Sequence, residues 1–175
     1  IASITGSKSS AASDYQLSAT SKTVAATITA KALTMSGLGA STKTYDGTTT
    51  AVLTGAGALQ AFETAGSGST SDGKAYTGDT VSLSGTAVGT FNSKDVLTAS
   101  SVSFSGLSLT GAQAGNYSLT IQSPVAKTIT AKTVGLSASK VYDGTTGLTG
   151  AVTITTGVGS EVLSYTGATA SDAHV

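Results

Sequence analysis

The chain has 175 residues with no cysteine, tryptophan or arginine, and its nine lysines balance nine acidic residues to give zero net charge. Zero net charge without arginine argues against nucleic acid as a partner, because phosphate recognition needs clustered positive charge. The lack of cysteine excludes disulfides, thiolate nucleophiles and zinc–thiolate sites. Serine and threonine supply 59 residues, yet 39% of the chain is hydrophobic, which favours a folded domain over a disordered segment.

In chain order, alternating apolar residues predict strands at residues 24–30, 81–83, 102–109 and 117–121. A period of two with small polar residues between the apolar ones is typical of antiparallel strands that bury one face. Clusters of glycine separate these runs at turn spacing, and no window of eleven residues has a helical period. The sequence therefore predicts an all-β protein.

The chain also repeats itself. Residues 13–37 align with residues 115–139, which places Tyr15 over Tyr117 at an offset of 102 and Lys31 over Lys132 at an offset of 101. A period of about 100 residues is the size of an independent domain, and it is much longer than one coil of a solenoid. We expect antiparallel, Ig-like β-sandwich repeats, with β-grasp-like repeats or a β-solenoid as alternatives.

The phase of the repeat divides the chain into three parts. Residues 1–30 are predicted to end one repeat, residues 31–131 to form a complete repeat, and residues 132–175 to begin the next. We therefore expect the chain to be a piece of a longer protein. The apolar phase slips by one residue at each predicted boundary, and no Gly/Ser or Pro linker interrupts either one, which predicts a semi-rigid rod.

The most informative short motif occurs twice, as KTYDGT at residues 43–48 and as KVYDGT at residues 140–145. Asp-Gly between strand-like runs favours a tight hairpin, because glycine adopts positive φ cheaply and the aspartate bonds back to its own turn. We expect each tyrosine ring at the edge of the core with its hydroxyl at a polar partner, and not a catalytic or sugar-binding Tyr-Asp pair. The candidate structural residues are Lys43, Tyr45, Asp46, Gly47, Thr48, Lys140, Tyr142, Asp143, Gly144 and Thr145, with Asn116 and Tyr117 from the repeated segment.

Residues able to do chemistry are few. His174 is the only histidine, and no serine or aspartate stands at a recognisable spacing from it for a catalytic triad. The carboxylates are dispersed, so most are expected to cap turns, with a Ca²⁺ site assembled in space from Asp-Gly turns as the alternative. An isopeptide crosslink to an acid, at Lys43 or Lys140, is a further alternative. We expect neither an enzyme nor a cofactor.

Three segments together resemble a known family: YDGTT preceded by lysine, GAQAGNYSLT at residues 111–120, and KTITAK at residues 127–132. They are similar to the YDG domain, which is repeated in tandem in bacterial exoproteins of the filamentous haemagglutinin type. The resemblance implies export across both membranes of a Gram-negative bacterium by a two-partner route. It also implies a place outside the cell or on its outer surface, and a role in adhesion, aggregation or biofilm matrix.

Two functions are compatible with these observations. The first is a structural stalk or spacer, whose partners are neighbouring repeats and whose incomplete ends allow head-to-tail self-association. In that case polysaccharide or a host surface is bound through other domains. The second function is a module that itself binds glycan or matrix polysaccharide. No stretch approaches 18 consecutive apolar residues, so we expect no membrane span.

Overall fold

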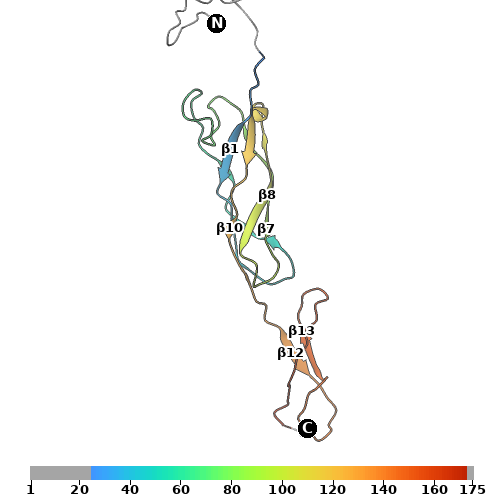
Figure 1. Ribbon diagram of the computed structural model, residues 1–175. Coiled ribbons are helices and arrows are strands. Elements are labelled where there is room, and N and C mark those ends of the chain that lie inside the picture. The colour runs from blue at the N-terminus through green and yellow to red at the C-terminus, as the bar shows by residue number, and fades with distance from the viewer. Residues whose placement is uncertain (1–24, 173–175) are drawn as a thin grey trace, which may run out of the picture.

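The structure is a computed structural model that describes residues 25–172, and these form an elongated body of short strands (Figure 1). Apart from a single 3₁₀ turn, η2 (Ala114–Asn116), all regular structure in this part of the chain is strand, which confirms the all-β prediction. The strands up to residue 130 are β1 (Lys31–Ser36), β2 (Gly39–Ala40), β3 (Lys43–Thr44), β4 (Thr50–Ala51), β5 (Leu53–Thr54), β6 (Ala58–Leu59), β7 (Ser82–Phe91), β8 (Ser101–Thr110), β9 (Tyr117–Thr120), β10 (Val125–Ala126) and β11 (Ile129–Thr130). Two further strands, β12 (Gly135–Ala138) and β13 (Val152–Thr155), follow them.

The longest element is the antiparallel hairpin of β7 and β8, which lies at the centre of a sheet with the order β10-β8-β7-β4. Its alternation follows the sequence, since serine and threonine face solvent while Phe91 and Val102 face inward. The register shifts between Gly85 and Val88, where Gly85 has φ 93°. A Cβ on Gly85 would lie 2.3 Å from the carbonyl oxygen of Gly106, so this bulge requires glycine.

A second sheet has the order β6-β1-β9. Its central strand, β1, is antiparallel to one neighbour and parallel to the other. β1 is antiparallel to β6 but parallel to β9, with Lys31 opposite Tyr117 and Thr34 opposite Thr120. β11 is likewise parallel to β3. The expectation of purely antiparallel sheets is wrong at these two ladders, because alternation reports which face is buried and not the direction of the neighbouring strand. The pairing of sequence-distant strands also differs from a solenoid.

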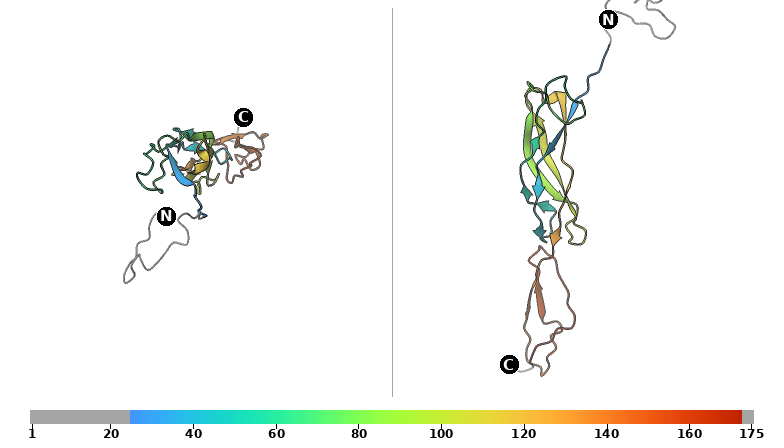
Figure 2. Two further views of the ribbon diagram at one scale, coloured as in Figure 1. Left: turned by 90° about the horizontal axis from the view of Figure 1, so that it is seen from above. Right: turned by 90° about the vertical axis from the view of Figure 1, so that its left-hand side faces the viewer.

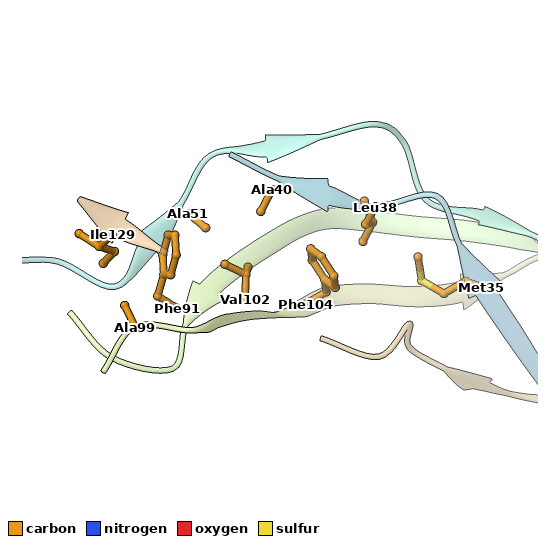
Figure 3. Packing of buried hydrophobic residues seen from close by; sticks show 9 residues of the cluster. All are labelled: Met35, Leu38, Ala40, Ala51, Phe91, Ala99, Val102, Phe104 and Ile129. Carbon is orange, nitrogen blue, oxygen red and sulfur yellow. The ribbon is translucent and has the colours of Figure 1, made fainter. Parts of the chain in front are cut away.

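The core is a narrow layer between the sheets, drawn in Figure 3. Its main cluster consists of Met35, Leu38, Ala40, Ala51, Phe91, Ala99, Val102, Phe104 and Ile129. A second, smaller cluster surrounds Leu33 and includes Tyr117. Leu33 and Val102 are completely buried, whereas three members of the main cluster are alanines, which lets the sheets approach closely.

The segment that follows β11 continues along the long axis of the molecule (Figure 2). Here β12 and β13 form a two-stranded antiparallel sheet in which Leu136 faces Ile154. This pairing matches that of Met35 with Leu59 in β1 and β6. The burial differs, because Leu136 is 69% exposed while Met35 is 4% exposed. Within residues 25–172, no helix is long or apolar enough to cross a membrane.

Candidate functional site

The first copy of the repeated motif folds into a turn that its own side chains tie together. Gly47 has φ 79°, and Oδ1 of Asp46 accepts hydrogen bonds from the backbone N–H and the hydroxyl of Thr48, both at 2.9 Å. Nζ of Lys43 donates to Oδ1 of Asp46 at 2.7 Å and to the carbonyl and hydroxyl oxygens of Thr48 at 2.7 and 2.8 Å. The aspartate therefore makes an Asx turn, and the ammonium group of Lys43 bonds to both Asp46 and Thr48 across it.

The second copy uses the same atoms for the same contacts. Gly144 has φ 74°, and Oδ1 of Asp143 accepts from the N–H and the hydroxyl of Thr145 at 3.0 and 2.9 Å. Nζ of Lys140 lies 2.7 Å from Oδ1 of Asp143, and it donates to the carbonyl and hydroxyl oxygens of Thr145 at 3.0 and 2.9 Å. A further bond, to the carbonyl oxygen of Gly147 at 2.7 Å, is found in this copy. Because the two turns sit in different surroundings, their common geometry comes from the local sequence.

These contacts also fix the charge of the turn. The hydrogen bond from Lys43, helped by the N–H of Thr48, lowers the pKa of Asp46 to about 2. The hydrogen bond from Lys140, helped by Thr145, lowers the pKa of Asp143 to about 2. Both carboxylates are more than half exposed, so their ion pairs contribute little to stability by themselves. At neutral pH these ion pairs keep the lysine, aspartate and threonine of each turn in contact.

The turn does not close a β-hairpin, and that prediction is wrong. The strand before it, β3, pairs with β11, and the strand after it, β4, pairs with β7. Asp-Gly specifies a local reversal of the chain, but tertiary contacts decide which strand each arm then joins. Here the turn carries the chain from one sheet to another.

The first tyrosine behaves as predicted. Its ring, Tyr45, is half-buried against the main cluster, and its hydroxyl donates to the carboxylate of Glu161. This hydrogen bond raises the pKa of Tyr45, and burial adds to the effect. Nζ of Lys94 lies 5.8 Å from the ring centroid. Tyr142 does not follow the prediction, because its side chain is 58% exposed. Within the described residues, β12 and β13 have no buried cluster like the one that covers Tyr45.

The partner of Tyr45 belongs to a loop beyond β13, so the first motif turn meets the segment that follows it. Val158 of this loop is 7% exposed, and a Cβ added to Gly47 would lie 2.8 Å from its Cγ1 atom. Nζ of Lys132 donates to the carbonyl oxygen of Gly157 at 2.9 Å. The loop at residues 156–161 is therefore seated on the turn at residues 43–48. We call this contact the joint.

A second polar cluster lies at the start of β1. Nζ of Lys31 is 2.5 Å from Oε1 of Glu63, 3.0 Å from Oδ1 of Asp72 and 4.2 Å from the centroid of the Tyr76 ring. Burial opposes the charge on the ammonium, but hydrogen bonds to both carboxylates outweigh it and raise the pKa of Lys31 above its usual range. We call these four residues the Lys31 cage. Sequence reasoning missed it, although the alignment of Lys31 with Lys132 marked the position.

Asn116 and Tyr117 lie beside this cage and far from the motif turns. Tyr117 is 7% exposed, and its hydroxyl donates to Oδ2 of Asp79 at 2.5 Å and accepts from the N–H of Tyr76 at 3.0 Å. Burial, together with the hydrogen bond to Asp79, raises the pKa of Tyr117. Asn116 is exposed at the end of η2, where its backbone N–H donates to Gln113. The predicted residues therefore lie in three places: the first motif turn at one end of the strands β1 to β11, Asn116 and Tyr117 at the other end, and the second motif turn between β12 and β13.

Other predicted chemistry finds no assembled site among the residues that the structure describes. No three carboxylate or imidazole side chains within residues 25–172 lie close enough to hold a metal ion, so the Ca²⁺ alternative has no candidate cluster there. Lys43 and Lys140 each lie beside an aspartate, as the crosslink alternative requires, but those aspartates are open to solvent. His174 lies outside the described residues.

Comparison with known proteins gives one match. A family model described as the YDG domain matches residues 29–126, which is more than half of the chain. No curated protein matches the chain. No solved structure matches it either.

Proposed function

The chain belongs to the YDG domain family, and from that premise we propose that it is a structural stalk or spacer of a large secreted bacterial adhesin or biofilm-matrix fibre. In this role it holds other, binding domains away from the outer surface of a Gram-negative cell after two-partner secretion. The chain itself carries out no reaction. Its contribution to adhesion or aggregation is length and direction.

The observation that carries this proposal is the joint. Tyr45 donates to Glu161, and Val158 is buried against Gly47, so the body at residues 31–131 and the segment after it share a contact surface. The chain passes between them in a few residues, from the end of β11 at Thr130 to the start of β12. A stalk needs such short, packed connections, because a flexible linker transmits neither distance nor direction.

We further propose that the units are tandem Ig-like β-sandwich repeats, with residues 1–30 ending one repeat, 31–131 complete and 132–175 beginning the next. Two features support this division. The motif turns share their geometry, and β12 pairs with β13 in the register that relates β1 to β6. The first 24 residues lie outside the described part of the chain.

The stalk proposal is tested in the parent protein on its own cells. Replacing residues 31–131 with an unrelated rigid domain of equal length is expected to preserve adhesion or aggregation, and deleting them is expected to shorten the fibre in electron micrographs. A control replacement with a Gly/Ser segment of the same residue count should weaken adhesion, because it restores chain length but not direction. Loss of adhesion in the rigid replacement, with secretion intact, would contradict the spacer role.

Glycan binding is the second candidate, and one surface favours it. An open groove at the N-terminal end is lined by polar and aromatic side chains, including Thr70, Tyr76, Asp79, Asn116 and Tyr117. Against it, Nζ of Lys31 covers the Tyr76 ring, which a sugar would need as a stacking platform. A glycan array with the whole chain separates the two functions. Reproducible binding that Tyr76→Ala abolishes, with unchanged melting, would favour the glycan module.

A further inference from the structure

The first and last strands of the 31–131 body are both held by parallel neighbours. The chain enters this body through β1, which pairs with β9 over four residue pairs from Lys31–Tyr117 to Thr34–Thr120. It leaves through β11, which pairs with β3 at Ile129–Lys43 and Thr130–Thr44. The ladder of β11 and β3 continues one step further, since the N–H of Tyr45 donates to the carbonyl oxygen of Thr130 at 2.9 Å.

Parallel pairing of terminal strands determines how a pulling force acts. When the chain is pulled at both ends, β1 is drawn towards the N-terminal end, while β9 is drawn the other way because it leads on to β10 and β11. The two strands must then slide along each other, so all hydrogen bonds of the ladder are strained together. The same holds for β11 against β3, which is tied through β2 to β1. From this topology we propose that the 31–131 body is a tension-bearing element with a shear clamp at each end.

Side chains extend the clamp between β1 and β9 in both directions. At its start, the Lys31 cage ties the first residue of β1 to the loop that carries Glu63 and Asp72. Beyond its end, the side-chain amide of Gln122 takes the place of a strand: its Oε1 accepts from the N–H of Leu38 at 3.0 Å, and its Nε2 donates to the carbonyl oxygen of Leu38 at 2.8 Å. Both contacts resist the same sliding motion, the cage because the N–H of its member Tyr76 donates to the hydroxyl of Tyr117 in β9 at 3.0 Å.

The core also covers one face of each clamp. Leu33 in the middle of β1 is 0% exposed, Tyr117 at the start of β9 is 7% exposed, and Ile129 in β11 is 2% exposed. Water that reaches a strained hydrogen bond can replace one partner and lower the cost of breaking it, and the buried side chains on the inner face keep water from reaching the ladder on that side. Forced unfolding is governed by the rate of crossing this barrier and not by equilibrium stability alone.

This inference goes beyond the spacer role, which requires length and direction but no resistance to force. It rests on strand direction within one body and needs no contact with a neighbouring repeat. A weak body would overturn the clamp and leave the spacer proposal standing. If the body resists force but the parent protein adheres equally well without it, the spacer proposal falls and the clamp stands.

Direction of pulling is the decisive variable, and the cysteine-free chain makes it easy to control. In one variant of the whole chain, handles are attached at Ala30→Cys and Ala131→Cys, so both clamps are strained in shear. In the other, they are attached at Ala30→Cys and Gly115→Cys, next to the adjacent starts of β1 and β9, so the ladder is peeled apart one pair at a time. The substituted positions are exposed, and a Cβ on Gly115 meets nothing within 4 Å. Equal melting temperatures confirm equal folding.

We expect the unfolding force at one pulling rate to be several times higher along Ala30–Ala131 than along Ala30–Gly115. Gln122→Leu should lower the force in the first direction and leave the second almost unchanged, and Lys31→Met should lower the force in the first direction. Lys140→Met is the matched control, because its ion pair with Asp143 lies in the segment after β11 and outside both clamps. Equal forces in the two directions, or no effect of the Gln122 and Lys31 variants beyond that of Lys140→Met, would overturn the clamp.

Discussion

At the scale of single residues, Gly47 has two separate requirements. Its φ of 79° is one that L side chains rarely adopt, and the space that a Cβ would fill lies 2.8 Å from Cγ1 of Val158. Gly144 has the first requirement without the second, because it has φ 74° but meets nothing within 4 Å. The two copies of one motif therefore separate the conformational role of the glycine from its role in the joint.

This difference predicts unequal effects of the same substitution. Gly47→Ala and Gly144→Ala should each lose about 1–2 kcal/mol of local stability from left-handed strain, and Gly47→Ala should lose more because it also displaces Val158. Native-state amide exchange at Thr48 and Thr145 measures each local loss separately. If the two turns lose equal local stability and the amide exchange of Val158 is unchanged, Gly47 does not contribute to the joint.

The charge of the motif turn predicts a dependence on acid. The pKa of Asp46 falls from 3.8 to about 2 in the folded chain, so its contribution to stability is present above pH 3.8 and is lost as the pH falls through about 2. The backbone N–H of Thr48 donates to Asp46, so we expect the chemical shift of this amide to change with pH in the same window. Asp46→Asn should abolish that titration, and a Thr48 titration centred near pH 4 would show that Lys43 does not hold the carboxylate.

At the scale of elements, the sequence predicted the strands better than their partners. The alternation of small polar and apolar residues located β8, β9 and the start of β7, because a half-buried strand must alternate. The strand predicted at residues 24–30 is wrong, since residues 25–30 form no strand. The same pattern is silent on direction, so the parallel ladder of β1 with β9 could not be foreseen. The Asp-Gly turn was found from its local chemistry, whereas the pairing of β3 with β11 depends on residues about 86 positions away, such as Lys43 and Ile129.

The candidate site shows the same division. Contacts within the motif, such as Lys43 with Asp46, follow from a spacing of three residues and were within reach of sequence reasoning. Tyr45 was expected at the core edge, but its partner Glu161 is 116 residues away. The Lys31 cage brings together three side chains from a turn-rich loop, and nothing in a single sequence links them to Lys31. Local chemistry was predictable, and long-range partners were not.

Two leucines in different sheets predict different costs of truncation. Leu33 in β1 is fully buried between β6 and β9, whereas Leu136 in β12 is 69% exposed. Leu33→Ala should destabilise the 31–131 body by roughly 2–5 kcal/mol, and Leu136→Ala should have little effect. Chemical denaturation followed by tyrosine fluorescence measures both. Similar midpoints for the two variants would mean that β1 does not organise this core.

At the scale of the whole molecule, the sheets that contain β1 and β12 differ in their number of strands. β12 and β13 form a sheet of two strands, and large apolar side chains around it are exposed, among them Val141 and Val162 at 89%. In β1 the corresponding sheet is completed by β9. Such an edge invites an incoming strand.

We therefore expect the isolated chain to associate head to tail with copies of itself, with residues 1–30 of one molecule completing the sheet of the next. Sedimentation velocity should show species that grow with protein concentration, and deletion of residues 1–30 should abolish them. Leu136→Glu, which places a charge on the acceptor sheet, should have the same effect. A clean monomer at all concentrations would reject this expectation.

The stiffness of the joint is the central claim, because a stalk whose units swing freely does not set distance or direction. Spin labels at Ser105→Cys on β8 and Thr149→Cys before β13, both exposed positions, report the distance across the joint by pulsed electron resonance. We expect a single narrow distance distribution that broadens in Glu161→Ala, which removes the hydrogen bond from Tyr45, and in Gly47→Val, which displaces Val158. A distribution in the unaltered joint as broad as that of the two variants would contradict this claim.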